Sequence, residues 1–141
     1  MKFSYALALA GALAFVACGG DSNPSSAQAD CSVTGGVKVV SPAAGETFKI
    51  NDEITVVYGS DVDDSGYRVE YFVSDDAKGV SLTSGSVGLD GQGDGKTCYE
   101  VKVKLDSEIK GVVASTKAFI RVIPYNRSSL YGASGKFTVK E

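Results

Sequence analysis

Residues 67–73 read Tyr-Arg-Val-Glu-Tyr-Phe-Val, and this stretch decides the fold class because apolar and charged side chains alternate along it. Alternation with a period of two is typical of a strand that buries one face and exposes the other to water. Residues 99–105, Tyr-Glu-Val-Lys-Val-Lys-Leu, repeat the pattern with charged residues on the outer face. Both stretches therefore predict antiparallel strands with one solvated face.

The same rhythm continues through the rest of the chain from residue 37 onward. Short apolar runs broken by Gly, Ser and Asp occur at residues 37–40, 53–58, 79–83, 117–123 and 135–140. The run at 117–123 carries apolar groups on both faces, as a central strand does. Without a convincing helical segment, the strands must cover one another, and two packed sheets do this economically. We predict an all-β, immunoglobulin-like or fibronectin-III-like antiparallel β-sandwich of about seven strands over residues 37–141, with an up-and-down barrel as the alternative.

Composition limits the function classes. The 141 residues, 43% apolar and 22% charged, suffice for one ordinary domain. There is no His and no Trp. The lack of His removes the commonest general base and the commonest nitrogen ligand of metals. A formal charge of -3 offers no basic field for nucleic acid. We expect no enzyme activity, no cofactor and no nucleic-acid partner.

The N-terminus has the layout of a secretory signal. Lys2 precedes an uncharged apolar run at residues 5–17, which is short for a spanning helix of ~20 residues. Residues 15–18, Phe-Val-Ala-Cys, resemble a bacterial lipobox, in which the signal peptide is cleaved before a lipid-modified Cys. The resemblance implies a lipoprotein signal peptide at residues 1–17 and lipidation of Cys18. An ordinary signal peptide cleaved after Ala17 is the alternative.

A tether follows the predicted anchor. Residues 18–36 are small and polar and offer little to bury, so we expect a lipidated N-terminus and a flexible linker. A flexible chain from Cys18 to Cys31 has an r.m.s. reach of about 20 Å. Gly19 follows Cys18, and the absence of Asp there favours the outer membrane of a bacterial cell envelope over retention at the inner membrane.

The cysteine count agrees with an anchored, secreted chain. With Cys18 used for the lipid, Cys31 and Cys98 remain as a pair in an oxidising compartment. We predict a Cys31–Cys98 disulfide. A metal site is the competing reading, and two thiols without His make a poor one.

Two segments resemble a known family. Residues 40–58, VSPAAGETFKINDEITVVY, look like the opening of the Ser/Thr-rich, membrane-anchored immunoglobulin-like domains related to yeast cell-wall synthesis proteins, with Tyr58 where the family has Trp. Residues 118–139, AFIRVIPYNRSSLYGASGKFTV, are similar to the last hairpin of those domains. The resemblance implies an immunoglobulin-like fold over most of residues 37–140.

Acidic loops raise the question of calcium. Asp90, Gln92 and Asp94 stand at positions 1, 3 and 5 of a loop with Gly95 at position 6, as in an EF-type calcium loop. Glu100 falls at position 11, where such a loop needs an acid at 12, and the flanks are strands. A solvated turn is the better explanation of these residues, so we predict no metal site and keep calcium at this loop as the alternative.

Opposite charges concentrate in successive parts of the chain. Residues 51–95 hold ten acids against two bases, and residues 96–140 hold nine bases against three acids. Acidic and basic strands are interleaved in a sandwich, so we predict cross-strand pairing of the solvated faces.

The candidate binding site is the loop between the last two predicted strands. Tyr125, Asn126, Arg127 and Tyr131 lie on it, and aromatic, amide and guanidinium groups are the types that anchor partners. Capping of the open end of the core by the two tyrosines is the alternative.

These features together favour a lipid-anchored envelope lipoprotein that acts as a non-catalytic binding or interaction module. The expected partners are the membrane, through Cys18, and an envelope protein or polysaccharide. A structural or adhesive surface component without a small ligand, and a carbohydrate-binding module, are the alternatives. The missing Trp argues against a sugar platform, although Tyr125 and Tyr131 could substitute for it.

Overall fold

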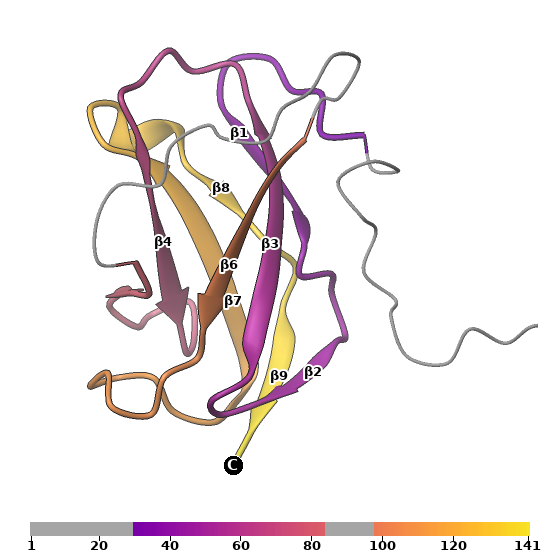
Figure 1. Cartoon of the computed structure of the whole chain (residues 1–141), viewed down its shortest axis with the longest axis vertical. Helices are drawn as coiled ribbons and strands as arrows, with labels where there is room; N and C mark the ends of the chain where they lie inside the picture. The colour runs from indigo at the N-terminus through magenta and orange to yellow at the C-terminus, as the bar shows by residue number, and fades with distance from the viewer. Residues whose placement is uncertain (1–29, 84–97) are drawn as a thin grey trace, which may run out of the picture.

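The described part of the chain forms two β-sheets packed face to face (Figure 1). The computed structural model describes residues 30–83 and 98–141. Its strands are β1 (Val37–Ser41), β2 (Thr47–Lys49), β3 (Glu53–Ser60), β4 (Tyr67–Phe72), β5 (Val80–Ser81), β6 (Tyr99–Lys104), β7 (Ser115–Pro124), β8 (Gly132–Ala133) and β9 (Phe137–Lys140), and the 3-10 turn η1 (Ser128–Leu130) precedes β8.

The strands divide between a small and a large sheet. One sheet has the order β1-β3-β6, and the other has the order β2-β9-β7-β4-β5 with β8 paired to β7. The chain changes sheet between β1 and β2, just after the cis peptide bond of Ser41 and Pro42. β2 pairs with β9 in parallel, whereas the other pairs are antiparallel. The predicted sandwich of immunoglobulin-like or fibronectin-III-like type is confirmed.

All seven predicted strands are present, with small shifts at their ends. The central position predicted for residues 117–123 is confirmed, because β7 lies between β4 and β9. Two strands were not predicted: β2 and β8 have three and two residues, too few for any alternation to be visible. None of the described residues lies in a helix that could cross a membrane.

Tyrosine side chains fill the centre between the sheets. Tyr58, Tyr67 and Tyr71 are almost fully buried. The Tyr67 hydroxyl donates to the Val62 carbonyl at 2.9 Å, and the Tyr71 hydroxyl donates to the Val113 carbonyl at 2.8 Å. Burial raises the pKa of Tyr71 to about 12. The rings thus supply apolar volume to the core while these two hydroxyls keep a hydrogen bond, which a buried hydroxyl needs.

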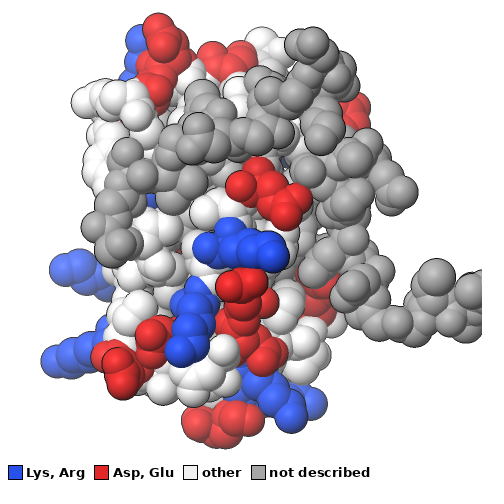
Figure 2. Space-filling model, in the orientation of Figure 1, with Lys and Arg blue, Asp and Glu red and all other residues white. Residues whose placement is uncertain are grey.

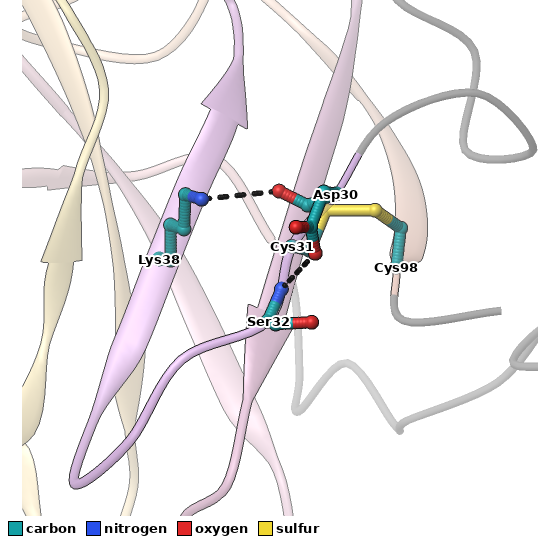
Figure 3. The surroundings of a disulfide bond; sticks show 5 residues. All are labelled: Asp30, Cys31, Ser32, Lys38 and Cys98. Atoms are coloured by element: carbon teal, nitrogen blue, oxygen red, sulfur yellow. Dashed lines mark hydrogen bonds between the residues drawn. A yellow bond between two sulfur atoms is a disulfide. The ribbon is translucent and has the colours of Figure 1, made fainter.

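The predicted disulfide is confirmed: Cys31 and Cys98 are joined, with their Cα atoms 5.1 Å apart (Figure 3). The bridge lies on the outer face of the three-stranded sheet, where both cysteines are buried together with Val57. A side chain at Gly59 would overlap the carbonyl oxygen of Cys31, so the N-terminal segment rests directly on β3.

The segment before β1 is held to the sandwich at further points. The Asp61 carboxylate accepts hydrogen bonds from the N–H groups of Gly35 and Gly36. The Lys38 ammonium donates to the Asp30 carbonyl at 3.1 Å (Figure 3). Residues 31–36, which we assigned to the linker from their composition, are therefore attached to the folded unit.

A cross-strand charge pair of the predicted kind joins the solvated faces of β3 and β6. Lys102 of β6 lies 3.7 Å from the Glu53 carboxylate of β3, and the Lys136 ammonium bonds the Asp75 carboxylate across 61 positions of sequence. Figure 2 shows blue and red side chains interleaved on the face where β3 and β6 lie nearest the viewer. Exposed pairs of this kind contribute ~0.2–1 kcal/mol each, so they contribute less to stability than the core does.

Candidate functional site

The loop from residue 125 to 131 lies at the end of the sandwich where the N-terminal segment is attached, opposite the C-terminus (Figure 1). Its first residue continues the pairing of β7, because the Tyr125 N–H donates to the Gly66 carbonyl at 3.1 Å. The η1 turn then reverses the chain, with the Leu130 N–H bonded to the Arg127 carbonyl. The loop is thus built on the ends of β4 and β7.

Asn126 fastens the loop to the neighbouring loop between β3 and β4. Its backbone N–H donates to the Asp64 carboxylate at 2.8 Å, and its side-chain amide donates to Asp64 at 3.1 Å and to the Ser65 hydroxyl at 3.2 Å. Burial alone would raise the pKa of Asp64, but the hydrogen bonds from Asn126, Gly66 and Ser65 outweigh it and hold this pKa below its ordinary value. Asn126 therefore fixes the backbone of the loop through its hydrogen bonds to Asp64 and Ser65.

Asp61 fixes the backbone of the N-terminal segment, as Asp64 fixes the loop at residues 125–131. The N–H groups of Gly35 and Gly36 hold the pKa of Asp61 below its ordinary value of 3.8. A group of this kind stabilises the fold above its unfolded pKa, and the contribution is lost as the pH falls through the folded pKa. The Asp61 and Asp64 oxygens thus hold the loops at this end together.

We expect Asp61→Asn to lower the melting temperature at pH 7, because the neutral amide is a weaker acceptor for the two glycine N–H groups. The difference from the natural protein should shrink as the pH falls below 3.8 toward the lowered pKa of Asp61, where the natural carboxylate itself takes up a proton. Melting curves from pH 7 to pH 3 measure this. The exposed Asp63, changed to Asn, serves as the control and should leave the curves unchanged. A difference that grows with acidity contradicts the role given to Asp61.

The two tyrosines of the loop project outward. Tyr125 and Tyr131 are each 42% exposed, so the structure does not place them in the core. Each has an arginine against its ring: Arg121 lies 4.3 Å from the centre of Tyr131, and Arg68 lies 5.9 Å from the centre of Tyr125. Together with the exposed Arg127, which lies between the tyrosines in sequence, these residues form what we call the arginine–tyrosine patch.

Arg121 is the most enclosed member of the patch. Its guanidinium lies 4.5 Å from the ring centre of Phe72 and 5.5 Å from that of Phe119, and these two rings stack 4.9 Å apart on the outer face of the large sheet. Its Nε is buried without a hydrogen-bond partner. Glu70 stands opposite Arg121 in the sheet register, yet it pairs with Arg68 at 2.8 Å. Arg121 is thus ordered by aromatic contact and keeps its charge unpaired among the described residues.

The patch holds all three arginines of the chain, Arg68, Arg121 and Arg127. Our sequence analysis named Arg127 but took Arg68 as part of a solvated face and did not select Arg121. A usable signal existed, since both residues alternate with apolar neighbours and face outward next to the loop. Which aromatic ring each guanidinium contacts depends on the register of the paired strands, and this register cannot be read from the sequence.

Two of the predicted sites lie in parts of the chain that the structure does not describe. Cys18 and the glycine-rich loop with Asp90, Gln92 and Asp94 lie outside the described residues, so they remain predictions. Within residues 30–83 and 98–141, no group of three or more acidic, cysteine or histidine side chains is arranged to hold a metal ion.

A scan against protein-family models gives no match, and a search of the curated proteins gives none either. Among solved structures, the chain is similar to the fibronectin(III)-like modules of Clostridium thermocellum CbhA, with 16% sequence identity and a TM-score of 0.35. The match covers 74% of this chain and 94% of that one.

Proposed function

We propose that this protein is a lipid-anchored binding module of the bacterial cell envelope, and that it meets its partner through the arginine–tyrosine patch. The apolar segment at residues 5–17 followed by Cys18 supports the anchor, and the Cys31–Cys98 disulfide agrees with an oxidising compartment. The absence of His supports a non-catalytic role.

The observation that carries the binding role is the contrast between a fixed loop backbone and exposed aromatic side chains. Asn126 ties the loop to Asp64, yet Tyr125 and Tyr131 remain 42% exposed. Tyrosine and arginine dominate binding hot spots because they offer large contact areas with polar tips. A loop that is already ordered loses little conformational entropy when a partner binds.

Replacement of Tyr125 and Tyr131 by serine tests this role. If the rings serve a partner, the double variant should melt within about 10 °C of the natural protein, because the two exposed cation–π contacts contribute only ~0.5–1 kcal/mol each. Tyr71→Ser, in the core, is the matched comparison and should lower the melting temperature by more than about 15 °C. A double variant that falls as far as Tyr71→Ser would mean that the loop tyrosines cap the core, and the proposal would fail.

The anchor has its own test. Growth with radiolabelled palmitate should label the natural protein and leave Cys18→Ser unlabelled, because the lipid can attach only to this sulfur and amino group. The variant with Cys31 and Cys98 changed to serine is the control and should keep the label. Label that persists in Cys18→Ser refutes the assignment of the lipid anchor to Cys18. It does not bear on the binding role proposed for the arginine–tyrosine patch.

A further inference from the structure

The arginine–tyrosine patch also indicates the chemistry of its partner. We propose that it binds a polysaccharide whose sugars carry carboxylate groups, an inference that rests on the proposed function and narrows it to one ligand class. The patch lies on the outer face of the large sheet. It runs along β4 and β7 and includes the loop at residues 125–131, which follows β7. Three features carry the proposal: unpaired guanidinium groups, half-exposed flat rings, and a position on the face of a sheet rather than along the edge of a strand.

The guanidinium groups supply the charge complementarity. Arg121 and Arg127 have no carboxylate partner among residues 30–83 and 98–141, whereas Arg68 is paired with Glu70. Guanidinium forks match the two oxygens of a carboxylate, and lysine does not offer this geometry. Because Arg121 is already stacked between Tyr131 and Phe72, binding an anion would cost it little rotamer entropy. An anion at the patch therefore meets one guanidinium ordered by aromatic contact and one that is exposed to solvent.

The tyrosine rings supply the contact for the sugar itself. A pyranose ring presents a flat face of C–H groups that packs on an aromatic ring, with its hydroxyls directed to the sides. Tyr125 and Tyr131 each keep 42% of their surface exposed although an arginine lies against each ring. Each ring can thus accept a sugar on its free side, and the unpaired guanidinium groups of Arg121 and Arg127 supply the positive charge for its carboxylate.

The position of the patch favours a sugar polymer over a peptide. β4 is paired with both β5 and β7, and β7 is paired with β4 on one side and with β8 and β9 on the other. Backbone N–H and C=O groups of a sheet lie in its plane, so a peptide lying across this face would find few partners for its own N–H and C=O groups. A polysaccharide has no backbone amide that must be satisfied, and its hydroxyls can stay in water.

The test uses the full lipoprotein in a non-ionic detergent, with polygalacturonate as the probe and its fully methyl-esterified form as the neutral match. We expect polygalacturonate to bind and the ester to bind at least tenfold more weakly. Arg127→Gln and Arg121→Gln should each weaken binding at least fivefold. Lys102→Gln removes the same charge from the other sheet and should change affinity by less than twofold. Arg121→Lys, which keeps the charge and loses the fork, should also weaken binding.

Several outcomes overturn the inference. Equal binding of the ester and the acid removes the role of the carboxylate, and equal affinity for polyglutamate or for phosphatidylglycerol vesicles assigns the patch to a different polyanion. Since Arg121→Gln removes the guanidinium that packs over Phe72, its melting curve is recorded, and the exposed Arg127→Gln carries the conclusion if Arg121→Gln unfolds. If polygalacturonate does not bind, the proposal of a carboxylated polysaccharide as the ligand is wrong. If the tyrosine double variant is folded and stable in the same experiments, the proposed binding role of the patch still stands.

Discussion

Replacement of both Cys31 and Cys98 by serine lowers the free energy of unfolding by about 4 kcal/mol and the melting temperature by roughly 15–25 °C. The two cysteines are 67 positions apart, so the bridge removes a large share of the freedom of the unfolded chain. The loss is a large part of the ~5–15 kcal/mol that holds a domain together. Thermal unfolding followed by circular dichroism measures the effect.

The reagent control for this prediction is the natural protein heated with and without reductant. Reduction should reproduce the loss in the natural protein and leave the serine variant unaffected. The hydrogen bonds from Gly35 and Gly36 to Asp61 do not depend on the bridge. A variant that melts within a few degrees of the natural protein would mean that these contacts, rather than the covalent link, hold the segment in place.

Gly59→Val destabilises the fold by about 3 kcal/mol or more. A side chain at this position would overlap the Cys31 carbonyl oxygen, and its Cβ would come 2.7 Å from the Cys31 Cβ. The buried disulfide keeps Cys31 from moving away, so the strain passes into β3. Gly36→Ala is the matched control, since the nearest atom to its added Cβ, the Leu130 carbonyl oxygen, lies at 3.7 Å. Urea unfolding of both variants gives the difference.

The two predictions are coupled, which makes the second one sharper. In a background without the disulfide, the segment at Cys31 can lift away from β3, and Gly59→Val should then cost much less. A double-mutant cycle over both changes should therefore give an interaction energy of at least about 1 kcal/mol. Strictly additive losses would show that Gly59 is needed for a reason other than the contact with Cys31.

The fold was predictable because its long strands carry the alternation that a buried face requires. β4 and β6 place Tyr67 and Val103 inward as expected, and β7 was expected in the centre because both of its faces are apolar. β2 could not be predicted in this way, since Phe48 is its one apolar residue and its partner β9 lies about 90 positions away. β8 consists of Gly132 and Ala133, which give no pattern at all.

The candidate site was predictable in its loop and not in its sheet. Tyr125, Arg127 and Tyr131 stand together in the sequence, so composition alone selected them. Arg121 belongs to the site only because the chain turns at η1 and returns Tyr131 over β7. Such a contact depends on the path of the loop in space, and a single sequence does not fix that path.

The attachment of the N-terminal segment also determines how the molecule would respond to mechanical force. If the chain is tethered at Cys18, tension from the membrane reaches the domain first at Cys31. The disulfide passes that tension to Cys98, next to the first residue of β6, and leaves residues 32–36 and β1 slack. In a reduced molecule the tension would instead fall on the hydrogen bonds from Gly35 and Gly36 to Asp61, and on β1 once these have broken. The disulfide would thus carry the tension between the membrane anchor and the sandwich, and would keep it off β1.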